Sequence, residues 1–254
     1  MDAINEFLAH LEIEGYSKNT IRAYRSALSL LADRDISLID TTDISNILSG
    51  YNDPATAASR LSALNTFFAW AVGQNLIQRN PAEGIESGPT KERLPTPIPG
   101  NDLEKIFECV ATMPLPEQTY FALIRYLALK PTEALLLRVE DISWTDQVVV
   151  VKSQRGRRHI PFVAGDSELF TLLRVSCRER EGPLFISNRQ RQGSYYWAYR
   201  RWKRVMNNTG LDYTIEQLRQ VRIIEWINDG IPRKTISRWV GGLNSMFDDY
   251  YMEG

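Results

Sequence analysis

The proline-rich segment at residues 86–100 constrains the architecture of this chain most, because it interrupts the periodic patterns on either side. It contains Pro89, Pro95, Pro97, Pro99 and Gly100. Proline fixes φ and removes a backbone donor, so such a stretch stays extended and can join two domains. An ordinary surface loop is the alternative. The balance of positive and negative charge differs between the two sides of this segment, which favours a domain boundary. We expect domains at residues 1–88 and 101–254 with a linker at 89–100.

The first hundred residues show helical periodicity, and no strand-like alternation precedes residue 145. Residues 2–14 place apolar side chains at i, i+3, i+4 and i+7, which is one face of a helix that ends at Gly15. Ser17 is a typical N-cap, and Asp53 followed by Pro54 opens the longest apolar helical run. With a further helix start near residue 40, this part is predicted to be a bundle of four helices.

The second part adds a β-hairpin to further helices. A β-branched run at 145–151 and a shorter run at 158–162 flank a basic turn that contains Gly156, which predicts a hairpin with a cationic tip. Helices are expected at 101–112, 118–129, 165–180, 194–208, 215–229, 232–240 and 245–251. The predicted fold class is therefore mainly α with a small β-hairpin or sheet, in two domains.

Composition excludes several classes of protein. Hydrophobic residues make up 43% and charged residues 24% of the 254 residues, as in folded globular proteins. No stretch approaches the roughly 18 apolar residues of a membrane span, and the acidic N-terminus lacks a signal peptide's apolar core, so we expect a cytoplasmic protein without a membrane partner. Cys109 and Cys177 lie far apart, as do His10 and His159, which predicts no disulfide framework, no metal site and no cofactor.

The net charge of −1 argues by itself against a nucleic-acid partner, but the distribution of charge favours one. Residues 1–100 carry eight Lys/Arg against twelve Asp/Glu, whereas residues 101–254 carry twenty-two against nineteen. Positive charge is concentrated further at 152–158 and 189–204. Local basic stripes matter more for a phosphate partner than the total charge does.

Several stretches, taken in order, resemble the tyrosine recombinase (phage integrase) family. Residues 17–24, 58–68 and 80–83 are similar to the opening and close of its helical core-binding domain, and residues 132–142 are similar to the segment after its first catalytic arginine. The end of the chain, from 215–219 through the glycine pair 241–242 to the tyrosines at 250–251, resembles the end of its catalytic domain. The resemblance implies a SAM-like helical core-binding bundle and an α+β catalytic-type domain, which close around duplex DNA.

The resemblance also implies a metal-free reaction, in which a tyrosine attacks a backbone phosphate and forms a 3′-phosphotyrosyl link. Two arginines would clamp the oxygens of the transition state, a hairpin lysine would protonate the leaving 5′ oxygen, and histidines would assist proton transfer. The nucleophile position falls on Tyr251, for which a terminal aromatic packed on the domain is an equal alternative. Arg219 matches the second arginine.

The hairpin lysine falls on Lys152, although the turn is one residue off the usual spacing. Arg155 could serve instead, and a solvated basic turn is an equally good interpretation.

Three of the six expected groups are altered. Lys130 stands where the first arginine is expected, and lysine keeps the charge but loses the planar fork of donors. Glu216 replaces the histidine expected three residues before Arg219, and a carboxylate repels a phosphate. Gly242 replaces the second histidine and offers no side chain.

The expected DNA-contact surfaces are better retained than the expected catalytic groups. Residues 189–204 hold six cations interleaved with five aromatics, which fits phosphate contacts with packing behind them; an amphipathic helix with a solvated face is the alternative. The candidate DNA-binding residues are Lys18, Arg22, Arg25, Arg60, Arg155, Arg157, Arg189, Arg191, Arg200, Arg201 and Arg204.

These features lead to three hypotheses. The preferred one is a DNA-binding protein of this family that takes part in recombination or integration with impaired or absent strand cleavage, beside an intact recombinase or as a homo-oligomer on duplex DNA. The second is an active site-specific recombinase that uses Lys130, Lys152, Arg219 and Tyr251. The third is a helical interaction scaffold that does not bind DNA.

Overall fold

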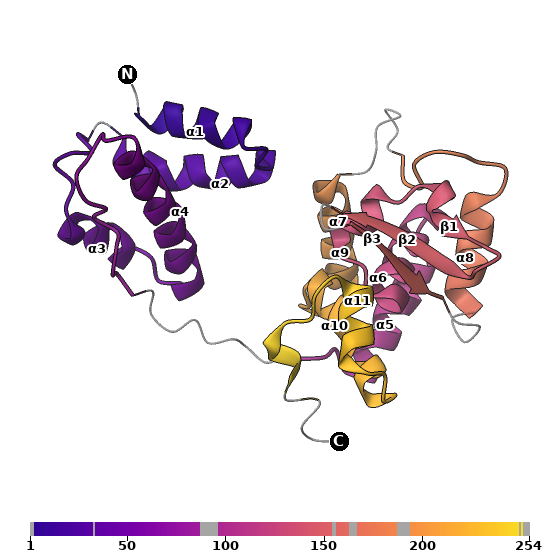
Figure 1. Cartoon of the computed structure of the whole chain (residues 1–254). Helices are drawn as coiled ribbons and strands as arrows, with labels where there is room; N and C mark the ends of the chain where they lie inside the picture. The colour runs from indigo at the N-terminus through magenta and orange to yellow at the C-terminus, as the bar shows by residue number, and fades with distance from the viewer. Residues whose placement is uncertain are drawn as a thin grey trace. The chain divides into compact units, whose positions relative to one another are not determined.

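The computed structural model describes residues 3–32, 34–86, 96–153, 156–162, 167–186, 194–248 and 250. The chain forms two compact units, Met1–Glu92 and Arg93–Gly254 (Figure 1). None of the described helices is long and apolar enough to cross a membrane.

The first unit is a bundle of helices whose starts are set by side-chain caps. Its helices are α1 (Ala3–Ile13), α2 (Lys18–Leu28), the 3₁₀ turn η1 (Ser29–Leu31), α3 (Thr41–Ser49) and α4 (Pro54–Gly73). The Ser17 hydroxyl accepts the Thr20 amide at 3.1 Å, and the Asp53 carboxylate accepts the Thr56 amide at 3.0 Å. Each cap satisfies an amide that has no partner within its helix. The predicted starts of α2 and α4 are thereby confirmed.

The core of the first unit lies between α1, α2 and α4. Phe7, Leu28 and Leu64 are fully or almost fully buried in it, and Phe7 packs edge-on against Phe67 with ring centroids 5.4 Å apart. Burial of the apolar faces of these helices is the main term that stabilises the bundle.

The second unit combines a small sheet with helices. Its elements are α5 (Gly100–Ala111), α6 (Leu115–Leu127), α7 (Pro131–Leu136), η2 (Val139–Asp141), β1 (Ile142–Ser143), β2 (Val148–Ser153), β3 (Gly156–Pro161), α8 (Ser167–Cys177), α9 (Tyr195–Thr209), α10 (Ile215–Asn228), α11 (Arg233–Val240) and η3 (Ser245–Phe247). The fold is mainly α with a small sheet, as predicted. The helix expected at 245–251 begins instead as the 3₁₀ turn η3.

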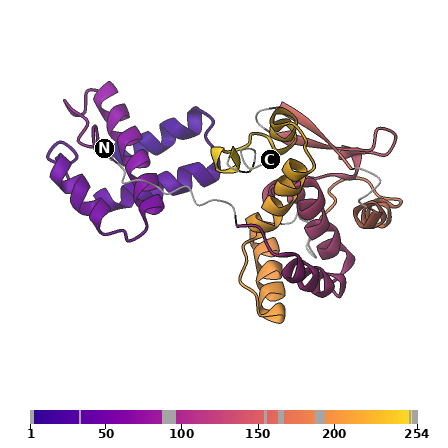
Figure 2. The same cartoon turned by 90° about the horizontal axis from the view of Figure 1, so that it is seen from below.

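The sheet has the order β1-β2-β3, and both neighbouring pairs are antiparallel. Val151 pairs with Arg158 and Lys152 pairs with Arg157, which fixes the register of the hairpin. The sheet contacts α7 and α11, and the hairpin lies beside α11 in both views (Figures 1 and 2).

The first strand of the hairpin starts later than the β-branched run predicted. Residues 144–147 form a turn between β1 and β2, in which the Ser143 hydroxyl donates to Asp146 at 2.7 Å. Gln147 adopts φ 52°, which lies outside the β region of backbone conformation. Thr145 therefore belongs to the turn, and the strand begins at Val148.

Candidate active site

The N-terminus of α7 presents Lys130 at two adjoining hollows, which are together called the cleft. Lys130 has an extended backbone, as expected before a proline, and its amide donates to Glu133 Oε2 at 3.0 Å. Pro131 begins the helix and needs no hydrogen-bond acceptor for its nitrogen. The Lys130 side chain is exposed, and its ammonium has no ion pair with any residue that the structure describes.

Arg219, on α10, is buried at 7% exposure, and each of its guanidinium nitrogens has an acceptor. Its Nε donates to the Ala128 carbonyl at 2.7 Å and its Nη2 to the Val240 carbonyl at 3.5 Å. Its Nη1 donates to Glu216 Oε1 at 2.6 Å, because residues three apart share one face of a helix. Arg219 therefore joins the ends of α6 and α11 while it is paired with a carboxylate.

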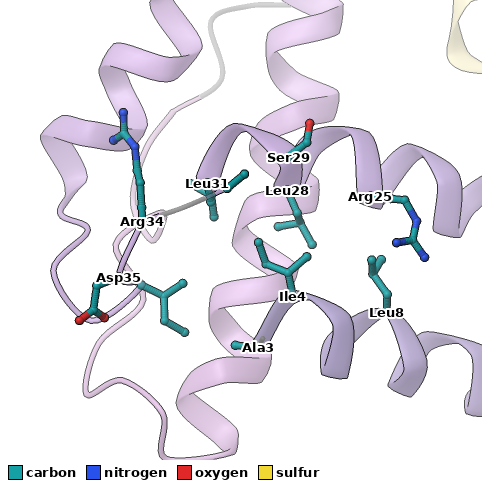
Figure 3. Close-up of a pocket in the computed structure, with 11 residues that line it drawn as sticks. Ala3, Ile4, Leu8, Arg25, Leu28, Ser29, Leu31, Arg34 and Asp35 are labelled. Carbon is teal, nitrogen blue, oxygen red and sulfur yellow. The ribbon is translucent and has the colours of Figure 1, made fainter. Parts of the chain in front are cut away.

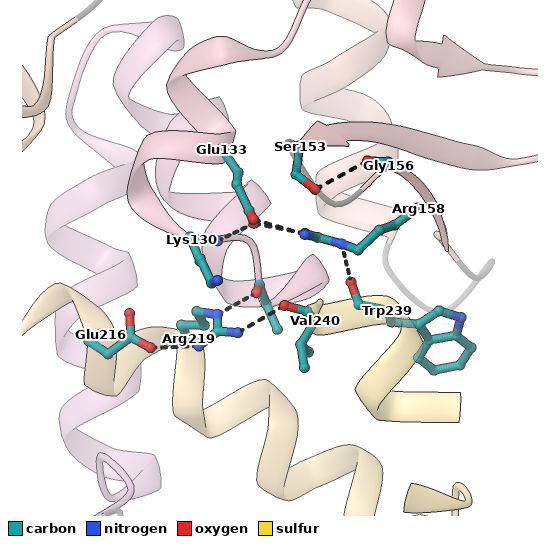
Figure 4. A network of polar contacts seen from close by, with 10 residues as sticks. Lys130, Glu133, Ser153, Gly156, Arg158, Glu216, Arg219, Trp239 and Val240 are labelled. Atoms are coloured by element: carbon teal, nitrogen blue, oxygen red, sulfur yellow. Dashed lines mark hydrogen bonds and ion pairs between the residues drawn. The ribbon is translucent and has the colours of Figure 1, made fainter. Parts of the chain in front are cut away.

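Arg158, on β3, makes a second arginine–carboxylate pair in the same cleft (Figure 4). Its two terminal nitrogens donate to Glu133 at 2.9 and 2.8 Å, and its Nε donates to the Trp239 carbonyl at 3.0 Å. Burial raises the pKa of Glu133, but the hydrogen bonds from Arg158 and from the Lys130 amide, with the two positive charges, outweigh it and hold the pKa below its usual value. Glu133 is thus a carboxylate in the folded protein.

A glycine turn closes the cleft after α11. Gly241 has φ 77° and Gly242 has φ 111°, and both amides donate to the Ser237 carbonyl, at 3.0 and 2.9 Å. A Cβ at Gly241 would lie 2.5 Å from Arg158 Nη1, so glycine is required there both by the backbone and by the arginine. Together, Arg158 and Arg219 donate to the carbonyls of Trp239 and Val240, in the last turn of α11.

Two hollows meet at Lys130. One of about 190 Å³ is lined by ten residues: Lys130, Glu216, Arg219, Gln220, Ile223, Gly242, Leu243, Asn244, Met246 and Phe247. Four of the predicted catalytic positions are therefore brought together: Lys130, Glu216, Arg219 and Gly242. The other, of about 450 Å³, is lined by Lys130, Glu133, Ser153, Arg158, Ser237, Arg238 and Gly241.

Two family models match this chain. Residues 4–75 match "Phage integrase, N-terminal SAM-like domain", and residues 97–251 match "Phage integrase family". The chain belongs to the phage integrase family. It is 25% identical over 270 residues to the tyrosine recombinase XerC of Roseiflexus castenholzii (strain DSM 13941 / HLO8), covering 94% of this chain and 85% of that protein.

Solved structures of integrases share the fold. A lambda integrase (75–356) dimer bound to a COC′ core site aligns with a TM-score of 0.77 at 18% identity, over 95% of this chain and 94% of that one. The Tn1549 transposon integrase (aa 82–397) in complex with circular intermediate DNA aligns with a TM-score of 0.76 at 16% identity, over 99% and 95% of the two chains.

Lys152 differs from the predicted catalytic positions that line the hollows of this phage integrase homologue. It lines neither hollow, and its Nζ pairs with Asp141, whose side chain is only 5% exposed. The other oxygen of Asp141 accepts the Arg138 amide at 3.0 Å. Tyr251, the predicted nucleophile, lies outside the described residues, as does Arg155.

The predicted DNA-binding cations of α9 differ in their surroundings. Arg200 and Arg204 are exposed, and Arg200 lies over the Tyr196 ring at 5.7 Å. Arg201 is instead half-buried, and its Nε donates to Glu117 at 3.1 Å while its guanidinium lies over Trp197 at 4.5 Å. Arg157 is exposed on β3, whereas Arg189 and Arg191 lie outside the described residues.

The candidate cations of the first unit lie mainly on α2. Lys18, Arg22 and Arg25 are exposed at i, i+4 and i+7 spacing, on one side of that helix. Arg25 also borders a hollow between α1 and α2, together with Leu8 and Leu28 (Figure 3). Arg60, on α4, donates to the Ser26 hydroxyl at 3.0 Å and so links α4 to α2.

Sequence reasoning missed Arg158, Glu133 and Ser153 as residues of the cleft. Arg158 and Ser153 reach it through the register of the hairpin, which no motif in the sequence specifies. Glu133 lies within a stretch that resembles the family, but its pairing with Arg158 joins residues that are 25 positions apart. Among the described residues, no group of His, Cys, Asp and Glu could hold a metal ion.

Proposed function

We propose that this chain is a DNA-binding member of the phage integrase family that takes part in DNA recombination or integration with impaired or absent strand cleavage. It would act as an accessory subunit on duplex DNA, beside an intact recombinase or a second copy of itself. The family assignment and the similarity to integrases solved with DNA support duplex DNA as the partner. The proposed loss of cleavage rests on one observation, the hydrogen bond that Arg219 donates to Glu216.

Cleavage of a phosphodiester concentrates negative charge on the oxygens around phosphorus, and it is catalysed by donors aimed at that charge. In this cleft, Glu216 accepts a hydrogen bond from Arg219 Nη1, and the other two nitrogens of Arg219 donate to backbone carbonyls. A phosphate would have to displace the carboxylate or accept its repulsion. Loss of one such donor typically reduces a rate by ~10²–10³.

The remaining changes act in the same direction. Lys130 offers a point charge where an arginine would offer two parallel donors. Gly242 lines the hollow but supplies no group for proton transfer, a contribution worth ~10²–10⁴ in rate. These losses are not additive, but together they would leave little cleavage.

Binding to DNA needs cations on the surface rather than an intact active site. Exposed arginines remain at Arg22 and Arg25 on α2, and at Arg200 and Arg204 on α9. Each phosphate that a protein neutralises adds about 0.9 to the slope of log K against log salt. We expect duplex affinity to fall steeply between low and physiological salt, whereas a flat response would favour the scaffold hypothesis.

Trapping on a nicked DNA substrate tests the loss of cleavage. The wild-type chain should form no covalent adduct. The double variant Lys130→Arg, Glu216→His should form one, and the added change Tyr251→Phe should abolish it; Gly242 is left unchanged because its φ of 111° disfavours any side chain. An adduct formed by the wild-type chain and lost in Tyr251→Phe would instead establish an active recombinase. This is the second candidate function, because Lys130 and Arg219 line the same hollow.

A further inference from the structure

The two faces of the hairpin differ in what they meet. Side chains alternate along a strand, and directly paired residues on neighbouring strands share a face. Val151 is 1% exposed and is paired with Arg158, so both lie on the face that meets the interior and the cleft. Ser153, two residues after Val151, lies on this face too, and it lines the hollow together with Lys130 and Arg158.

Lys152 lies on the opposite face, together with its cross-strand partner Arg157. From there its Nζ reaches Asp141, at the end of η2. Asp141 is almost fully buried, and its carboxylate is satisfied by this ammonium and by the Arg138 amide. The pair therefore connects β2 to the turn that precedes the sheet.

We infer that Lys152 is a structural residue that neutralises the buried Asp141, and that Ser153 is the residue through which β2 faces the cleft. Within the described part of the hairpin, the strands then bring Arg158 and a hydroxyl to the cleft, but no ammonium that could protonate a leaving oxygen. This inference rests on the proposed function and deepens it, because it adds a fourth altered position to Lys130, Glu216 and Gly242.

The competing view is that Lys152, whose side chain is 52% exposed, swings into the cleft when DNA binds. Such a movement would leave the carboxylate of Asp141, at 5% side-chain exposure, without its cation. A buried charge that loses its partner destabilises the fold strongly. The side chain would also have to cross from one face of the sheet to the other.

A double-mutant cycle tests the structural role without DNA. Lys152→Met keeps an aliphatic side chain but removes the charge, and it should lower the Tm of the second unit by about 3–6 °C, the effect of losing one hydrogen bond to a buried charged group. In the Asp141→Asn background the same change should have a much smaller effect. Arg157→Met is the matched control, since it removes a cation from the same face, and it should leave Tm nearly unchanged. Equal small effects of Lys152→Met and Arg157→Met would overturn the structural role.

The salt dependence of duplex binding tests which residue faces the cleft. Ser153→Lys should steepen the slope of log K against log salt by about one and tighten binding, whereas Ser153→Met, of similar size, should not. Lys152→Met should leave the slope unchanged, and Lys130→Met should reduce it by about one. A slope reduced by Lys152→Met and unaffected by Ser153→Lys would overturn the assignment. If the wild-type chain shows no salt-dependent binding at all, the proposed function fails, and the stability cycle still decides the role of Lys152.

Discussion

At the scale of single residues, the cleft is defined by the pairing of its charges. Arg219 is paired with Glu216 and Arg158 with Glu133, whereas Lys130 has no ion pair with any residue in the described part of the chain. Both arginines also donate to backbone carbonyls, so they contribute to the stability of the fold. An arginine that matches a catalytic motif therefore has a structural role here as well.

Arg219→Met should lower the free energy of unfolding by about 2–4 kcal/mol, because the Ala128 carbonyl loses its donor and Val240 loses a weaker one. Urea denaturation of the two proteins measures the difference. Arg238→Met is the control, since Arg238 is exposed on α11 and has no ion pair within the described ranges. Equal stabilities of the Arg219→Met and Arg238→Met variants would show that Arg219 is a solvated helix arginine.

Glu133 should give the fold a pH-dependent contribution. The pKa of Glu133 is lowered from 4.5, since the hydrogen bonds from Arg158 and Lys130 outweigh its burial. A lowered pKa means that the carboxylate stabilises the protein above about pH 4.5, and that this contribution is lost as the pH falls through the lower folded value. The stability difference between wild type and Glu133→Gln should therefore be largest near neutral pH and shrink in acid, as followed by urea denaturation. The exposed Glu104→Gln is the control, and an equal pH dependence in both variants would contradict the prediction.

At the scale of elements, the hairpin and the glycine turn determine which side chains reach the cleft. The sequence predicted the hairpin strands and the helices around them, because caps, prolines and apolar periodicity are local signals. It could not predict the faces of β2, since four consecutive valines at 148–151 conceal the alternation that separates the two faces. The resemblance alone matched Lys152 to the hairpin lysine, although the turn was one residue off the usual spacing, whereas the register brings Ser153 to the hollow that Lys130 also lines.

Gly241→Ala should destabilise the protein more than Gly210→Ala does. Both glycines end a helix with positive φ, 77° and 69°, so both variants pay a similar backbone cost of about 1 kcal/mol. Only at Gly241 would the new Cβ displace Arg158, from a distance of 2.5 Å. Thermal unfolding should show an additional loss of about 1–2 kcal/mol at Gly241, in the range typical of overpacking. Identical losses at both positions would mean that Arg158 moves without cost.

At the scale of the whole molecule, the chain has two separate hydrophobic cores, one in each compact unit. The sequence predicted a helical first part, a proline-rich boundary and a mixed second part, because each of these is encoded by local composition. The pairs that build the cleft join α7 to β3 and α6 to α10, across 25 and 91 positions. Such contacts depend on how helices pack, and single-sequence patterns do not encode that.

Two cores should unfold as two thermal transitions that respond to different substitutions. Leu64 and Leu123 are each 0% exposed, one in each core, and their replacement by alanine should cost about 2–5 kcal/mol. Leu64→Ala should lower one transition in calorimetry and Leu123→Ala the other. A single transition lowered by both substitutions would show that the two units unfold as one cooperative structure.

Arg158 and Arg219 donate hydrogen bonds to the last carbonyls of α11, so a ligand in the cleft should affect how readily the end of this helix opens. An anion that attracts either guanidinium would loosen the hydrogen bond to Trp239 or Val240, at the same end of α11 whose Ser237 carbonyl accepts the Gly241 and Gly242 amides. Deuterium uptake at these two glycine amides would then rise when a phosphate enters. The helix end would serve as a built-in reporter of ligand entry that requires neither turnover nor a label.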